Sequence, residues 1–203
     1  MKIFNTIKSI ILVILVFTVG IVAAQDTTQQ IVNGRFNSAS AQKKPYVIMF
    51  SIDGLRADFV DKYNATALQA YGKNGIVADY MTSSFPSLTF PNHYSIVTGL
   101  YPAHHGLVDN TFFDEKANAT YTMANKKMVA DPYWYGGTPL WVLAEKQQML
   151  TASFYWVASE TPILNTTPTY YYYYNDKIKI EKRINQIKEW LSLPEKTRPH
   201  LIT

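Results

Sequence analysis

The chain of 203 residues contains no cysteine and few charged side chains. The absence of cysteine excludes a disulfide framework and a lipid anchor attached to a thiol. Charged residues make up 17% of the chain, and its formal net charge is +4. Lys2 and Lys8, near the N-terminus, contribute two of the positive charges. The rest of the chain is too close to neutral to attract a nucleic-acid duplex by bulk electrostatics, so we expect no such partner.

Long hydrophobic runs are also scarce, and the one near the N-terminus has the pattern of a secretory leader. Residues 9–24 are uncharged, follow two lysines and end in the small residues Val22-Ala23-Ala24. We predict a signal peptide over residues 1–24 and export to the periplasm or the extracellular space, with no membrane span left after cleavage. The alternative is a membrane anchor formed by residues 9–24, although about 16 residues fall short of the roughly 20 that span a bilayer.

The remainder divides into a polar lead-in and a single domain. Residues 25–43 are rich in Gln, Ser, Thr and Asn without periodicity, which predicts a flexible segment. Residues 44–203 alternate short apolar runs with helical patterns, which is typical of an α/β sheet with crossover helices. We expect strands at 46–52, 76–81 and 151–156, and helices at 61–71, 138–148 and 177–193.

Thr89 is predicted to lie where a loop becomes a helix. Pro86 and Pro91 bracket it, and the helix should continue to Gly99, where glycine can end it. A hydroxyl at this position faces unpaired N–H groups and the positive end of the helix dipole, which favours phosphate binding. The alternative is an ordinary capping threonine without reactivity.

Asp53 follows the predicted strand at 46–52. The carboxyl ends of strands in open α/β sheets are where ligands bind. The sequence therefore predicts a carboxylate at the mouth of a site.

Three motifs in a fixed order carry a family resemblance. Asp53-Gly-Leu-Arg56, Thr89-Phe-Pro-Asn-His-Tyr94 and the segment Gly99 to Asn110 resemble the nucleotide pyrophosphatase/phosphodiesterase family of the alkaline phosphatase superfamily. The likeness covers roughly residues 44–203. It implies an alkaline-phosphatase-like fold, a mostly parallel central sheet flanked by helices, of which this chain is the N-terminal portion.

The resemblance also implies a reaction and a set of site residues. Thr89 would be the nucleophile and a metal ligand, and Asp53 a ligand of the same ion, one of two divalent cations that are zinc in the family. A hydroxyl bound to such a cation becomes a better nucleophile. The reaction would pass through a covalent threonine-nucleotide intermediate and release a nucleoside 5′-monophosphate. The side-chain amide of Asn110 and the backbone N–H of Phe90 would donate to a phosphate oxygen, unless Asn110 is only a turn residue.

Aromatic residues are the candidates for binding a small nucleotide substrate. Phe90 and Tyr174 occupy the positions where the family sandwiches a base, and Trp156 either lines the same pocket or packs in the core. The run of tyrosines at 170–174 is interpreted as a strand whose alternate rings face opposite sides, so that some line a site or all are buried. We do not expect the neighbouring histidines to ligate metal, because the family's histidine ligands lie in later motifs. These histidines are His93, His104 and His105.

The later acidic and histidine motifs are not in this sequence. We therefore expect the polypeptide to represent part of a longer enzyme and to have little activity alone. The segment 156–160 and Leu88 depart from the family pattern, which puts substrate choice in doubt. The alternatives are a phospholipid or phosphonate hydrolase of the same superfamily, and an inactive or non-catalytic protein that binds nucleotides.

Overall fold

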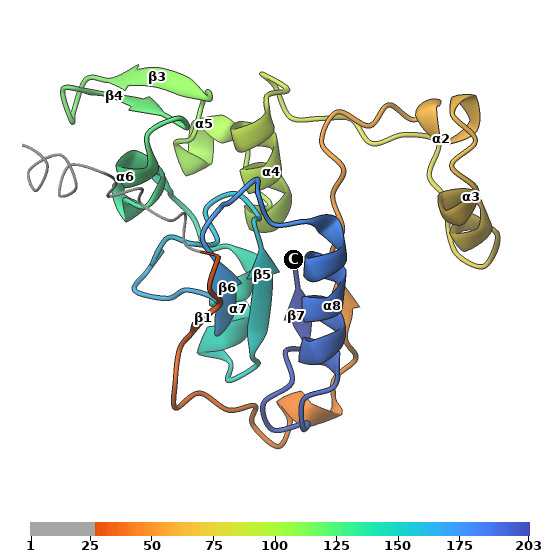
Figure 1. Ribbon diagram of the computed structural model, residues 1–203. Coiled ribbons are helices and arrows are strands. Elements are labelled where there is room, and N and C mark those ends of the chain that lie inside the picture. The colour runs from red at the N-terminus through yellow and green to blue at the C-terminus, as the bar shows by residue number, and fades with distance from the viewer. Residues whose placement is uncertain (1–26) are drawn as a thin grey trace, which may run out of the picture.

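The computed structural model describes residues 27–203, so the predicted leader lies outside the described part (Figure 1). A five-stranded sheet runs in the order β1-β6-β5-β7-β2. β1 pairs antiparallel with β6, and every other neighbouring pair is parallel. The prediction of a mostly parallel α/β sheet is confirmed. The strands are β1 (Gln30–Ile31), β2 (Val47–Ile48), β5 (Thr151–Phe154), β6 (Tyr170–Tyr172) and β7 (Leu201–Ile202).

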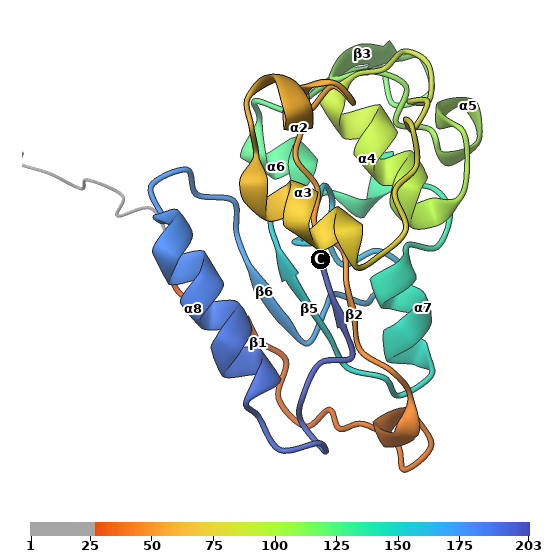
Figure 2. The same cartoon turned by 90° about the vertical axis from the view of Figure 1, so that its right-hand side faces the viewer.

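Helices cover both faces of this sheet. Figure 2 shows α8 (Ile180–Leu191) on one side and α7 (Leu140–Lys146) on the other, with α4 (Thr89–Thr98) above them. On the α8 side the buried indole of Trp190 belongs to a cluster with side chains of β5, β6 and β7. The C-terminal helix therefore buries one face against the sheet, as expected of an amphipathic helix.

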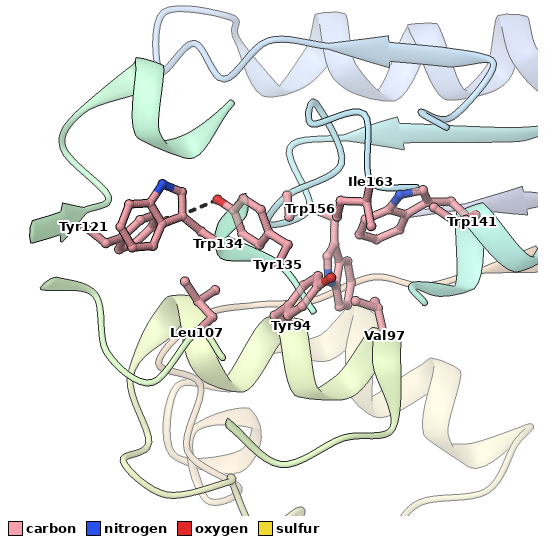
Figure 3. Close-up of a cluster of buried hydrophobic side chains, with 11 residues drawn as sticks. Tyr94, Val97, Leu107, Tyr121, Trp134, Tyr135, Trp141, Trp156 and Ile163 are labelled. Carbon is pink, nitrogen blue, oxygen red and sulfur yellow. Dashed lines mark hydrogen bonds between the residues drawn. The ribbon is translucent and has the colours of Figure 1, made fainter. Parts of the chain in front are cut away.

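A second core lies between α4, α7 and the loops that join them (Figure 3). Tyr94 and Val97 of α4 are fully buried in it, together with Trp141 of α7. This packing fixes α4 relative to the sheet. The remaining elements are a 3₁₀ turn η1 (Ala41–Lys43), α2 (Phe59–Lys62), α3 (Thr66–Lys73), α5 (Pro102–His105), the hairpin β3 (Thr111–Asp114) with β4 (Ala119–Thr122), α6 (Lys126–Val129) and η2 (Pro132–Trp134).

Two of the expected strands are wrong in extent or existence. The apolar run at 46–52 forms only the two residues of β2, which are half exposed because β2 is an edge strand with β7 as its one neighbour among the described strands. No strand forms at 76–81, where Ile76 is fully exposed and the described chain offers no strand for pairing. Both segments are apolar in sequence, but neither is enclosed between layers.

The helix expected at 61–71 is divided. α2 ends before Asn64, which adopts a left-handed conformation with φ of +49°, and α3 begins at Thr66. Figure 1 shows these two short helices set apart from the sheet. The helices expected at 138–148 and 177–193 form as α7 and α8 over shorter ranges.

Over its described part, the lead-in predicted at 25–43 makes specific contacts with the domain. Gln30 and Ile31 form β1, and Arg35 makes an ion pair of 3.3 Å with the buried carboxylate of Glu145. Asn37 is only 4% exposed. The polar side chains of Arg35 and Asn37 therefore bond to groups of the domain.

Candidate active site

Helix α4 places Thr89 at its first position. Leu88 precedes the helix with an extended backbone, and Gly99 ends it in the left-handed conformation with φ of +69°. Leu88 is the capping residue, and no side chain caps this end. Thr89 is therefore not an ordinary capping threonine, and its hydroxyl is used elsewhere.

The Thr89 hydroxyl meets the carboxylate of Asp53. Oγ1 of Thr89 donates to Oδ2 of Asp53 at 3.1 Å, although 36 residues separate the two in sequence. Asp53 lies five residues beyond the carboxyl end of β2 and is exposed to solvent. The expected juxtaposition of these two oxygens is present in the structure.

The Thr89 and Asp53 oxygens lie close to the separation expected of two ligands of one metal ion. Two ligands of one tetrahedral zinc, each about 2.0–2.2 Å from it, lie roughly 3.3–3.6 Å apart. The Thr89 and Asp53 oxygens could approach this spacing with a small movement, so they fit one side of an ion. Within residues 27–203, however, no three His, Cys, Asp or Glu side chains group together as a metal site.

The side chain of Asn110 forms a hydrogen bond with the backbone of the first turn of α4. Its Oδ1 accepts the N–H of Phe90 at 3.0 Å, and its own carbonyl accepts the N–H of Met123 at the base of the hairpin. The amide of Phe90 is therefore engaged by Asn110, whereas we expected both groups to face a phosphate. The side-chain NH₂ of Asn110 is the donor that this bond leaves available beside Thr89.

The three aromatic candidates differ in environment. Trp156 is 8% exposed, belongs to the core and donates its indole N–H to the carbonyl of His93 at 3.0 Å, so the core-packing alternative describes its contacts. Phe90 packs against the same core. Tyr174 is more than half exposed, and its ring contacts the edge of Tyr155 at 5.2 Å between centroids.

Glu160 holds the backbone of Tyr174, which the sequence did not predict. Its Oε2 accepts the N–H of Tyr174 at 2.7 Å. Burial raises the pKa of Glu160, and the hydrogen bond from Tyr174 opposes this rise. The carboxylate thus connects the loop after β5 to the end of the tyrosine run.

The histidines do not assemble into a metal site. His105 is buried, its Nδ1 accepts the N–H of Leu107, and its Nε2 lies 3.0 Å from the hydroxyl of Ser95. Burial lowers the pKa of His105 to about 4, so the ring is neutral at pH 7. His104 is exposed next to it.

His93 and Ser51 are site residues that sequence reasoning missed. The His93 ring bridges the Ser51 hydroxyl and the carbonyl of Thr89, at 2.8 Å to each. The four-residue spacing of Thr89 and His93 on one helix was the available signal. Nothing in the sequence pointed to Ser51, because its partner is 42 residues away.

Comparison with known proteins gives this chain a family. The sequence profile of type I phosphodiesterase / nucleotide pyrophosphatase matches residues 47–203. The chain belongs to this family. The resemblance found in the three motifs is thereby confirmed.

Similar proteins of this family are much longer than the chain. Human ectonucleotide pyrophosphatase/phosphodiesterase family member 1 is 38% identical over 161 residues, which are 78% of this chain and 17% of the human protein. Venom phosphodiesterase of Macrovipera lebetinus is 37% identical over 162 residues, covering 77% of this chain and 19% of the venom protein. The chain therefore spans about a fifth of the length of these relatives.

Solved structures share the fold. Murine ectonucleotide pyrophosphatase/phosphodiesterase 5 superposes with a TM-score of 0.74 at 28% identity, covering 78% of this chain and 42% of the murine chain. That murine protein is an inactive threonine-to-alanine variant in complex with AMP. Among residues 27–203 of the present chain, no helix has both the length and the apolar composition to cross a membrane.

Proposed function

We propose that this protein contributes the nucleophile to the hydrolysis of nucleotide phosphodiester and pyrophosphate bonds, with Thr89 as the attacking residue. The observation that carries the proposal is the 3.1 Å hydrogen bond from the Thr89 hydroxyl to the Asp53 carboxylate, at the N-terminus of α4. The AMP bound to the murine relative supports a nucleotide as the substrate. The product that fits this chemistry is a nucleoside 5′-monophosphate.

The proposed reaction has two displacements at phosphorus. Oγ1 of Thr89 forms a bond to phosphorus while the bond to the leaving oxygen breaks, and the hydroxyl proton passes to solvent. Water then attacks the threonine-nucleotide ester, the bond between Thr89 and phosphorus breaks, and Thr89 regains its proton. The role proposed for the NH₂ group of Asn110 is to donate to a phosphate oxygen as its negative charge grows.

The cofactor proposed is a pair of divalent cations, with zinc the metal that the family resemblance implies. When bound, such ions lower the pKa of a coordinated hydroxyl and neutralise phosphate charge. Asp53 and Thr89 are the residues of this chain that would hold one of them. A single carboxylate and a hydroxyl do not select zinc over other divalent metals.

The base of the nucleotide is proposed to bind between Phe90 and Tyr174. The exposure of Tyr174 supports a stacking role, since a ring that is already packed has no free face. Stacking of this kind contributes roughly 1–3 kcal/mol per base and tolerates different bases. Export to the periplasm or the extracellular space remains part of the proposal and depends on the leader pattern in residues 1–24.

The nucleophile is tested by replacing Thr89 with alanine. The chain is loaded with Zn²⁺ and given the 4-nitrophenyl ester of thymidine 5′-monophosphate, and nitrophenolate release is measured. Turnover is expected to be low, to yield thymidine 5′-monophosphate, and to disappear in Thr89→Ala. Thr82→Ala, a substitution at an exposed residue outside the site, should leave the rate unchanged. Equal turnover by wild type and Thr89→Ala would eliminate Thr89 as nucleophile.

A further inference from the structure

A chain of hydrogen bonds joins the two segments that carry Asp53 and Thr89. Ser51 Oγ lies 2.8 Å from Nε2 of His93, and Nδ1 of the same ring lies 2.8 Å from the carbonyl oxygen of Thr89. Ser51 is two residues before Asp53, and His93 is one helical turn after Thr89. One imidazole ring therefore connects the segment after β2 to the first turn of α4.

The partners fix which nitrogen carries the proton. A carbonyl oxygen can only accept, so Nδ1 of His93 must donate to Thr89. In the neutral ring Nε2 is then the acceptor, and the Ser51 hydroxyl donates to it. Both ring nitrogens are used in this bridge, and neither is available to a metal ion or a substrate.

Trp156 contacts both the backbone and the ring of His93. The indole N–H donates to the His93 carbonyl at 3.0 Å, and the two rings meet edge to face with centroids 5.5 Å apart. Trp156 is itself buried in the core between α4 and α7. The bridge is thus anchored in the rigid part of the molecule.

The segment that the bridge holds has little other support. The N–H of Met49 donates to the carbonyl of Ile202, and beyond it residues 50–54 leave the sheet with exposed side chains. Asp53 belongs to this segment. The position of its carboxylate therefore depends on contacts made by the segment's side chains, and the bond between Ser51 and His93 is such a contact.

We propose that His93 is a positioning residue that ties Ser51 to the first turn of α4 and so keeps the Asp53 carboxylate within reach of the Thr89 hydroxyl. This inference rests on the proposed function, because it assigns His93 a purpose in assembling that site. This role of His93 differs from that of a residue that only stabilises the end of helix α4. A bond from Nδ1 to the carbonyl four residues earlier would steady the helix end by itself, whereas the bond to Ser51 adds nothing to the helix and acts only on the Asp53 segment.

Two substitutions remove the bridge from opposite ends. Ser51→Ala deletes the donor to Nε2. His93→Asn retains a donor close to the position of Nδ1 but is too short to reach Ser51. His104→Asn is the matched control, because His104 is exposed and lies on the short helix α5.

The first measurement is structural and needs no turnover. Crystal structures of the variant chains should show the distance from Thr89 Oγ1 to Asp53 Oδ2 increased from 3.1 Å beyond hydrogen-bond reach of about 3.5 Å in Ser51→Ala and His93→Asn, and unchanged in His104→Asn. Nitrogen-15 NMR of the histidine side chains should place the proton of His93 on Nδ1 in the wild-type chain. An unchanged distance in both bridge variants, or a proton on Nε2, would overturn the proposal.

The second measurement is kinetic. With Zn²⁺ and the nitrophenyl ester, kcat should fall roughly 10- to 100-fold in either bridge variant with a smaller change in KM, as for other groups that orient a reacting side chain. The double variant should be no slower than the slower single variant, because both changes remove the same link. Loss of turnover in Thr89→Ala together with an unaltered kcat in the bridge variants would reject the bridge and leave the proposed function standing. Turnover that survives in Thr89→Ala would reject the function, and the structures would still decide the bridge.

Discussion

At the scale of single residues, buried polar side chains do much of the joining between distant segments. Asn37 donates through Nδ2 to the carbonyls of Glu195 and Arg198, and its Oδ1 accepts the N–H of Leu150. These bonds attach the segment before η1 to the loops on both sides of the sheet. A buried polar group that loses its partners costs roughly 1–3 kcal/mol, so such residues are sensitive to substitution.

The first prediction concerns Asn37. Replacing it with alanine leaves two carbonyls and one N–H without their partner, and we expect the free energy of unfolding to fall by about 2–4 kcal/mol. Urea denaturation followed by circular dichroism measures the change. Asn33→Ala, at an exposed position nearby, should change stability by less than about 0.5 kcal/mol. Similar effects at the two positions would show that the buried bonds do not stabilise the fold.

The second prediction concerns the pH dependence that His105 adds. Burial lowers the pKa of His105 to about 4, whereas the unfolded chain binds this proton near pH 6.5. The unfolded state therefore takes up a proton first as the pH falls. The stabilisation is present in full above pH 6.5 and is lost as the pH falls towards 4, an effect on the order of 3 kcal/mol.

His105→Gln removes this titration while keeping a polar side chain. The free energy of unfolding, measured by urea titration at pH 7, 6, 5 and 4, should fall less steeply in the variant than in the wild type. His104→Gln should retain the wild-type slope because His104 is exposed. Parallel curves for wild type and His105→Gln would contradict the assignment.

At the scale of elements, local sequence signals predicted helices and strands correctly where the segment also packs against the rest of the domain. The prolines around Thr89 and the glycine at 99 predicted the bounds of α4, and the amphipathic pattern of residues 177–193 predicted α8. The run at 76–81 has equally strong apolar character but forms no strand. A strand requires a neighbour, and the presence of a neighbour is a property of the fold rather than of the segment.

The third prediction tests the end of α4. Gly99 has φ of +69°, and a Cβ there would meet no atom within 4 Å, so alanine would be opposed by backbone strain alone. We expect Gly99→Ala to lower the free energy of unfolding by about 1 kcal/mol. In Gly75→Ala the new Cβ would lie 3.6 Å from the carbonyl of Tyr71 without a positive φ, so thermal denaturation should show little change. Equal melting temperatures for the two variants would refute the role of Gly99.

At the scale of the whole molecule, the sequence motifs indicated which residues lie together at the candidate site, whereas the apolar runs did not give the extent of every strand. Thr89, Asp53 and Asn110 were selected from motif order, and the structure brings all three together at one helix end. The bonds of Ser51 to His93 and of Glu160 to Tyr174 could not be foreseen, because each joins segments that are separate in sequence. Sequence patterns identify groups that carry chemistry, while the contacts that orient those groups depend on the tertiary fold.

The fourth prediction concerns apolar side chains on the surface. Ile76 is fully exposed, and Val77 and Met81 are about 70% exposed on the segment between α3 and α4. Apolar surface of this kind favours self-association and dye binding. The double variant Ile76→Lys with Met81→Lys should bind less anilinonaphthalene sulfonate and sediment more uniformly as a monomer, with unfolding free energy within about 0.5 kcal/mol of the wild type.

A second double variant tests whether the added positive charges alone, rather than the loss of apolar surface, reduce dye binding. Thr82→Lys with Ser83→Lys adds the same two positive charges at exposed polar positions of the same segment. It should leave dye binding at the wild-type level. Equal reduction of dye binding in both double variants would assign the effect to charge instead.

The pairing of β2 with β7 joins the strand that leads to Asp53 to residues far along the chain. Val47 and Met49 donate their N–H groups to His200 and Ile202, which follow about 150 residues later. While the polypeptide is still emerging from the ribosome, β2 has no described strand beside it until these residues leave the exit tunnel. During synthesis, the strand that leads to Asp53 therefore stays without this neighbour until residues 200–202 have emerged, long after Thr89 has done so.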